Sequence, residues 1–408
     1  MNDLYYAINN LKKEASIFFQ KKQWKNYYET YSKMLKFSKE KHEVLCKMGV
    51  AKFYMGEITN SINLYKDSIN HKKNYETAHE NLAIAYKEIG KYEDAIENFI
   101  KVLKINNKNL KSKISVIDLL KYIEPKKNKN NYILEINKKI NEFGNKIKSK
   151  IENVEIKEFL KNSENVFKKK ENEIFFFETQ IIKKNSEDLG CKRHLKIFEE
   201  FKIIPNYCFN CYKVQILPEK VTDLIKLSFL FNNIKLKKNN IRKCMVEIRP
   251  NIVGNYKAYI YCKSVAEAED LKNDMNNKLK IIGIDDCKVE IKHGCSEYYS
   301  IYPDFKKINS KEGKNMHYPK EWITFEEKFD ERLPIRNKID LKKFLPTNSK
   351  INLSDFLVIK NWIIYADIIG DYSYKEIYNI KIKDYFIEKM ISNQIDFRKK
   401  EFTKSNNS

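Results

Sequence analysis

Four side chains of metal-binding types recur within about twenty residues of this chain, at spacings that suit a single ion. Cys191 and His194 form one short-range pair, and Cys208 and Cys211 form the second, in the pattern C-x2-H-x13-C-x2-C. Each pair can bind the ion from a single turn, and the segment between the two pairs is long enough to bring them together. Three thiolates and one imidazole complete a tetrahedral shell with no open position. The spacing therefore predicts a Zn2+ ion in a structural role, against the plain alternative of four unrelated residues.

Length and composition set broad limits on the class of protein. The chain has 408 residues, 42% of them hydrophobic, and a formal net charge of +23 at pH 7. It is long enough for several domains and too apolar to be wholly disordered. A charge of this size usually indicates a nucleic acid or another polyanion as partner. Here the excess is mostly lysine spread along the whole chain among abundant Asn and Ile, which is also typical of an AT-rich genome.

The expected location follows from two patterns that the sequence lacks. No apolar run reaches the roughly 18 residues of a membrane span, and the first residues do not have the basic-then-apolar layout of a secretory signal. We therefore expect a soluble, cytoplasmic protein without a membrane partner. In a reducing compartment, cysteines that cluster in sequence favour metal or redox chemistry over disulfides.

A period of 34 residues runs through the amino-terminal part of the chain. Paired positions carry similar residues: Gly56 and Gly90, Ile58 and Tyr92, Ser61 and Ala95, Tyr65 and Phe99. Each unit predicts two antiparallel helices that cross closely at the small residues. The copy that ends near Asn109 resembles the tetratricopeptide repeat, with signature positions filled by Leu82, Ala83, Tyr86, Gly90, Tyr92, Ala95, Phe99 and Val102.

The resemblance covers roughly residues 8–109 and implies a right-handed solenoid of about three helical hairpins. In that family the concave face binds a peptide or a partner helix, and residues 110–125 would cap the exposed apolar end. The repeat register implies that the groove is lined by Phe19, Cys46, Val50, Phe53, Tyr54, Ile84 and Lys87. Some of these side chains could instead pack against a neighbouring repeat.

The period changes after the second cysteine pair. Residues 212–217, 243–249, 255–262 and 287–295 alternate as strands do, whereas residues 222–233 and 266–279 have helical spacing. Strand, helix, strand, strand, helix, strand is the ferredoxin-like arrangement, with strand order 4-1-3-2. The fold class is therefore α+β. The predicted domains are 1–123 (helical repeats), 124–185 (helical linker), 186–304 (zinc-stapled ferredoxin-like domain) and 305–408 (mainly helical extension).

In such a sheet, several further cysteines fall at the end that carries Cys208 and Cys211. Cys244 and Cys262 are equidistant from the hairpin centre near Val253, so they are expected to face each other, and Cys295 follows the last strand. One of these thiols could replace a zinc ligand. A larger cluster would suit an iron–sulfur centre or a redox-active dithiol instead.

Alternation along the strands places cations and two tyrosines on the face away from the helices. The candidate residues on this face are Lys213, Lys257, Tyr259, Tyr261 and Lys292. Stacked bases and paired phosphates would suit such a face, so a single-stranded nucleic acid is an alternative partner. The ordinary account is that the face packs against the carboxy-terminal region.

The sequence contains no phosphate-binding glycine loop, no H-E-x-x-H and no G-x-S-x-G. We therefore interpret the chain as a non-enzymatic adaptor or scaffold that binds a protein or peptide in the repeat groove and carries structural zinc in a second module. The alternatives are a nucleic-acid-binding adaptor and a thiol-based redox or iron–sulfur enzyme.

Overall fold

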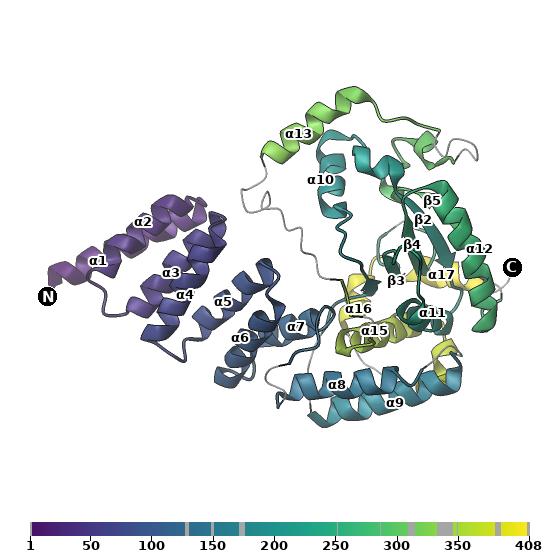
Figure 1. Ribbon diagram of the computed structural model, residues 1–408, viewed down its shortest axis with the longest axis horizontal. Helices are drawn as coiled ribbons and strands as arrows, with labels where there is room; N and C mark the ends of the chain where they lie inside the picture. Colours follow the sequence, from purple (N-terminus) through teal and green to yellow (C-terminus); the bar gives the residue numbers. More distant parts are fainter. Residues whose placement is uncertain are drawn as a thin grey trace. The chain divides into compact units, whose positions relative to one another are not determined.

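The computed structural model describes residues 2–126, 130–147, 151–170, 176–250, 252–285, 287–308, 315–332, 346–348, 350–379 and 385–405 (Figure 1). The described residues up to Leu134 form one compact unit, and nearly all of those from Glu135 onward form a second. Within the described residues, no helix is both long and apolar enough to cross a bilayer.

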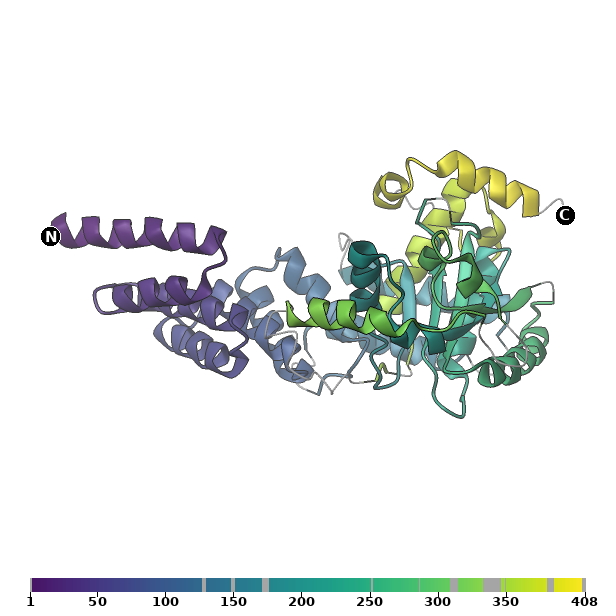
Figure 2. The same cartoon turned by 90° about the horizontal axis from the view of Figure 1, so that it is seen from above.

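The first unit consists of helical hairpins. Three pairs of antiparallel helices follow one another: α1 (Asn2–Gln20) with α2 (Trp24–Leu35), α3 (Lys41–Tyr54) with α4 (Ile58–His71), and α5 (Glu76–Glu88) with α6 (Tyr92–Ile105). A seventh helix, α7 (Leu110–Leu119), packs on α6. Figure 2 shows this succession from above. The described part of this unit contains helices and no strand, as the 34-residue period predicts.

Small residues lie where the helices approach most closely. Ala51, Ala83 and Ala95 are completely buried. A Cβ atom on Gly49 would lie 2.5 Å from a ring carbon of Tyr65, so only glycine fits at this crossing. Ala95 is thus buried, as its predicted place at a close helix crossing requires.

The second unit is built on one antiparallel sheet of five strands. The strands are β1 (Gln180–Lys183), β2 (Tyr212–Leu217), β3 (Arg242–Val246), β4 (Tyr256–Cys262) and β5 (Lys288–His293). Their order in the sheet is β1-β3-β4-β2-β5. Four of them occupy the places predicted from the sequence, whereas β1 comes from the segment that was predicted to be a helical linker. That segment also contains α8 (Tyr132–Gly144) and α9 (Asn153–Lys170).

Two helices follow their strands as the change of period predicts. These are α11 (Val221–Asn233) and α12 (Val265–Ile281), and both pack against strands of the sheet. On β2 and β4, the strand residues of one parity are completely buried: Val214, Ile216, Ala258 and Ile260. Alternation thus directs the apolar side chains towards a core beneath the helices.

A carboxy-terminal helix contributes a large part of the core of this unit. Helix α15 (Leu353–Ile369) is apolar on nearly all sides, and Trp362 donates its indole N–H to the carbonyl of Thr179 at 2.8 Å. Asn352 and Asp355 form a capping box at its start. The shorter helices α16 (Tyr385–Met390) and α17 (Ile395–Ser405) follow.

Candidate functional site

The predicted zinc ligands lie on short elements at one end of the sheet. Cys191 begins α10 (Cys191–Phe201), directly after Gly190, whose φ of 63° suits glycine. Cys208 lies in the 3-10 helix η1 (Asn206–Asn210), and Cys211 immediately precedes β2. The chain from α10 to η1 shares a small apolar core with Tyr298 and Phe305, which follow β5.

The predicted ligands do not converge on a single point in the described part of the chain. No group of three or more His, Cys, Asp or Glu side chains there is arranged to hold a metal ion. The Sγ atom of Cys208 lies 3.3 Å from the hydroxyl of Tyr298, and the ring of His194 stacks on Tyr207 with centroids 5.3 Å apart. The geometry of the described residues therefore gives zinc no support, and zinc stays a prediction from the spacing.

Burial also controls the chemistry of these thiols. Burial raises the pKa of the Cys211 thiol to about 11 and that of Cys262 to about 12, and it raises the pKa of Cys208 as well. These thiols are therefore protonated near neutral pH, where a metal ion would have to displace their protons. A protonated, buried thiol is also a poor nucleophile.

The expected pairing of Cys244 with Cys262 is wrong. Cys244 lies opposite Ala258, and Cys262 lies opposite Tyr212 on β2. Val246 pairs with Tyr256, so the hairpin is centred near residue 251 rather than at Val253. A shift of the centre by two residues moves each cross-strand partner by four positions.

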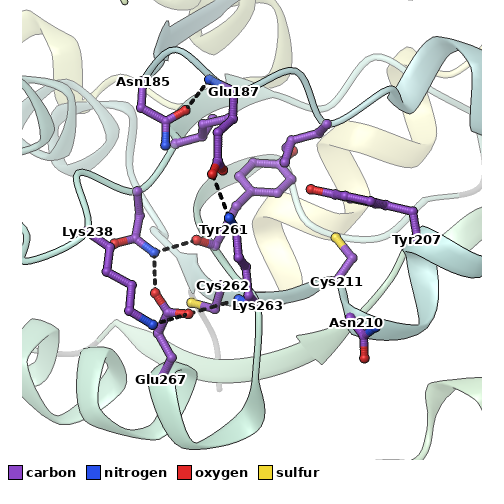
Figure 3. A pocket seen from close by; sticks show the side chains of 13 residues that line it. Asn185, Glu187, Tyr207, Asn210, Cys211, Lys238, Tyr261, Cys262, Lys263 and Glu267 are labelled. Carbon is purple, nitrogen blue, oxygen red and sulfur yellow. Dashed lines mark hydrogen bonds and ion pairs between the residues drawn. The ribbon is translucent and has the colours of Figure 1, made fainter.

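A hollow of about 610 Å3 lies beside this end of the sheet (Figure 3). Its wall includes Tyr207, Cys211, Tyr261 and Cys262. The carboxylates of the wall are each matched by a lysine: Glu187 pairs with Lys263 at 2.5 Å, and Glu267 pairs with Lys238 at 3.4 Å. The hollow therefore has balanced charge and presents aromatic rings and thiols.

The residues predicted to bind nucleic acid are largely covered. Lys213 is buried and donates to the carbonyl of Gly294 at 2.9 Å, and its Nζ atom lies 3.3 Å from the Sγ atom of Cys295. Lys257 is buried in an ion pair with Glu247 at 2.8 Å. Tyr259 is buried and Tyr261 is half-buried. Since stacking needs an open ring face, the geometry does not favour a nucleic acid on these two rings.

The predicted groove residues of the first unit differ widely in exposure. Cys46 and Phe53 are buried, and Val50, Ile84 and Lys87 are half-buried. Lys87 is also engaged by Asp118 of the capping helix α7, at 3.0 Å. The burial of Cys46 and Phe53 and the ion pair of Lys87 give these three side chains a part in packing within the array.

Two groove residues remain well exposed, Phe19 at 46% and Tyr54 at 44%. Both contact Trp24: the Tyr54 ring stacks on it with centroids 4.3 Å apart and planes 12° apart, and Phe19 meets it edge-on at 5.4 Å. The sequence analysis did not include Trp24 among the groove residues, although an aromatic residue at the start of the second helix could have indicated it. We call Phe19, Trp24 and Tyr54 the aromatic cluster.

The hairpin geometry repeats with the sequence period. Gly56 and Gly90 have positive φ angles of 85° and 73° at the turns inside the second and third hairpins, and Lys22 has a φ of 55° at the equivalent turn of the first. The amino-terminal array is tetratricopeptide-like.

No protein-family model and no curated protein matches this sequence. Among solved structures, the crystal structure of MamA is 16% identical with a TM-score of 0.27, and the match covers 40% of this chain and 80% of that chain. A tetratricopeptide repeat protein from Parabacteroides merdae ATCC 43184 is 15% identical with a TM-score of 0.28. That match covers 40% of this chain and 65% of the other, less than two thirds of its length.

Proposed function

We propose that this protein is a non-enzymatic adaptor that holds a peptide segment of a partner protein against the aromatic cluster. The observation that supports the proposal is the stacked pair of Trp24 and Tyr54, which joins the first hairpin to the second and leaves Tyr54 exposed. Aromatic rings on a rigid helical frame supply large contact area at low entropic cost, and such residues commonly dominate binding energy.

The surroundings of the aromatic cluster suggest the chemistry of the bound segment. Lys21, Lys22 and Lys25 are exposed in the turn between Phe19 and Trp24 and in the first turn of α2. An apolar or aromatic anchor with acidic neighbours would complement both the rings and these charges. We accordingly expect the partner segment to carry one large apolar side chain flanked by Asp or Glu.

For the second unit, we propose a ferredoxin-like module of β2 to β5 that is extended by β1. The element order and the sheet order support this proposal. In the adaptor this module would provide a rigid second body. A structural zinc ion and a cytoplasmic location remain parts of the proposal that rest on the sequence alone.

The test uses peptides selected from a displayed random library on the full chain, followed by affinity measurements with purified variants. Tyr54→Ala and Phe19→Ala should each weaken the binding of the selected peptides by about tenfold or more, because they remove anchoring rings. Phe37→Ala is the matched control, since Phe37 is also an exposed ring, at 56%, but lies beyond the end of α2. Equal affinities for all three variants would contradict the proposal.

A stability measurement separates lost binding from lost folding. Because Phe19 and Tyr54 are exposed, their replacement by alanine should lower the free energy of unfolding by no more than about 1 kcal/mol, the worth of an aromatic pair. A large loss of stability in Tyr54→Ala would show that its ring supports the array, and its binding data would then be set aside in favour of Phe19→Ala.

A further inference from the structure

A second hollow, of about 560 Å3, lies on the sheet of the second unit and is rich in cations. Its wall takes Gln215 from β2, Lys257 from β4, and Lys288, Glu290 and Lys292 from β5. The segment after β5 closes it with Ser296, Tyr299 and Lys306. Four lysines therefore face one carboxylate within the same cavity.

Ion pairs account for two of the four lysines. Lys257 pairs with Glu247 at 2.8 Å, and Lys288 pairs with Glu290 at 2.7 Å. In the part of the chain that the structure describes, Lys292 and Lys306 are in no salt bridge. The Nζ atom of Lys292 donates instead to the hydroxyl oxygen of Ser296 at 2.6 Å. Among the described residues, these two positive charges at the wall of the hollow have no ion-pair partner.

The ring of Tyr299 lies near the ammonium groups of both lysines. The ammonium groups of Lys292 and Lys306 lie 5.4 Å and 5.9 Å from the centroid of the Tyr299 ring. The hydroxyl of Tyr299 donates to the backbone carbonyl of His293 at 2.5 Å, which holds the ring in place. A cation over a ring face keeps its charge available to a further partner on the side away from the ring.

Neighbouring cations add to the positive field at Lys292. Burial lowers the pKa of Lys292 to about 8, and the like charges of Lys213 and Lys257 act in the same direction against the opposing influence of Cys295 and Glu297. Lys292 is therefore a cation near neutral pH whose charge is poorly stabilised by the protein. A bound anion would supply the missing stabilisation.

We propose that this hollow binds a small ligand through a phosphate group held between Lys292 and Lys306, with the Ser296 hydroxyl as a further polar contact. A phosphate carries up to two negative charges and so can neutralise both lysines, which a single carboxylate cannot. The volume is within the range of small-molecule sites, roughly 300 to 1,000 Å3. A nucleic acid strand is disfavoured because Tyr259 beside this face is buried and offers no stacking surface.

The experiment is calorimetric titration of the full chain at pH 7 and constant ionic strength, with inorganic pyrophosphate and ATP as probes. Both probes should bind and should compete with each other. Lys306→Gln and Lys292→Gln should each weaken the binding about tenfold or more, as expected for loss of a charge-assisted contact. Lys278→Gln removes the same charge from α12, where Lys278 pairs with Asp274, and should leave the affinity unchanged.

Two further measurements guard against misreading these variants. Lys306 is exposed, so its replacement preserves folding and the test stands even if Lys292→Gln unfolds. Raising the pH from 7 to 9 should weaken binding, because Lys292 loses its proton near pH 8 and with it the attraction for the anion.

Pyrophosphate affinities that are equal in Lys306→Gln and Lys278→Gln, or absence of binding by both probes, would overturn the proposal. So would a twelve-nucleotide oligouridylate that binds more tightly than ATP and loses affinity in the same variants, since the site would then serve nucleic acid.

Discussion

Lys183 on β1 and Asp355 at the first turn of α15 form a buried ion pair across 172 residues of sequence, with Nζ and Oδ2 2.8 Å apart. Their side chains are only 5% and 6% exposed. Asp355 also accepts the backbone N–H of Asn352 in the capping box, at 3.2 Å. The pair therefore joins the edge strand to the helix that carries much of the core.

Replacing one partner of this pair should be costly. Lys183→Met is expected to lower the free energy of unfolding by about 3 to 5 kcal/mol, because it leaves a buried carboxylate without its cation. Adding Asp355→Leu should recover part of the loss, and urea denaturation of the single and double variants measures both effects. Lys307→Met is the control, since its pair with Asp304 is 63% and 66% exposed. A loss no larger than that of the control would show that the pair is not coupled to folding.

Lys22 occupies a turn position that its repeat equivalents give to glycine. Its φ of 55° is in the left-handed region, where a side chain costs roughly 1 to 2 kcal/mol. Lys22→Gly should therefore stabilise the first hairpin by about 1 kcal/mol, less the entropy that glycine loses on folding. Thermal unfolding detects this gain, and Lys21→Gly, at a neighbouring position outside that region, should give none. Destabilisation by Lys22→Gly would mean that the lysine side chain supports the turn.

Glu247 makes stability depend on pH. Burial by itself would raise the pKa of this carboxyl, but hydrogen bonds from Arg249 and the ion pair with Lys257 outweigh it and lower the pKa to about 2. The ionised carboxylate therefore stabilises the fold at pH values above the ordinary pKa of 4.5. This contribution to stability is lost as the pH falls from 4.5 towards 2. The shift corresponds to a contribution on the order of 3 kcal/mol.

Denaturation at several pH values tests this assignment with Glu247→Gln. The stability difference between the unsubstituted chain and this variant should shrink as the pH falls from 6 to 2.5. Acid neutralises the carboxylate of the unsubstituted chain, whereas the variant has no charge at this position at any pH. Glu269→Gln, at an exposed position on α12, should show a small difference that does not change with pH. A constant difference for Glu247→Gln would refute the role of its charge.

The zinc prediction can be decided by elemental analysis of the purified chain. If Cys191, His194, Cys208 and Cys211 gather around one ion, about one zinc per chain should be found. Cys208→Ser should then remove the metal and lower the melting of residues 186–300 while sparing the repeats. Cys287→Ser is the control, because Cys287 directly precedes β5, whereas the four predicted ligands lie near the other end of the sheet. A chain that is fully folded and free of metal would end the prediction.

Local patterns were sufficient for most elements of this fold. The 34-residue period predicted the helical hairpins because a repeat packs mainly against its sequence neighbours, so spacing alone specifies its contacts. Alternation predicted β2 to β5 for a similar reason: side chains of one parity must all meet the same apolar layer. The exposed rings of Phe19 and Tyr54 also fell among the predicted groove residues.

Other features depended on partners that are distant in the sequence. The strand β1 has only four residues, and its two buried positions carry Ile181 and Lys183. A lysine at a core-facing position breaks the apolar alternation, so the strand is recognised only by its pairing with β3. Arg398 lies among polar residues in α17, yet it is fully buried and donates to the carbonyls of Arg249 and Ile252. A polar side chain is buried only where another part of the chain supplies acceptors.

The sequence by itself determined the repeat array, the strands β2 to β5 and the supply of cations on the sheet, because each of these follows from spacing along the backbone. Only the tertiary structure decided which of those cations are neutralised. Lys213 is buried against the carbonyl of Gly294, and Lys257 is paired with Glu247. Lys292 and Lys306 line the same hollow as Lys257 but are in no salt bridge with a described residue. Charge pairing depends on distances in space, which the pairing of the strands and the path of the chain after β5 set here, and which spacing along the backbone does not specify.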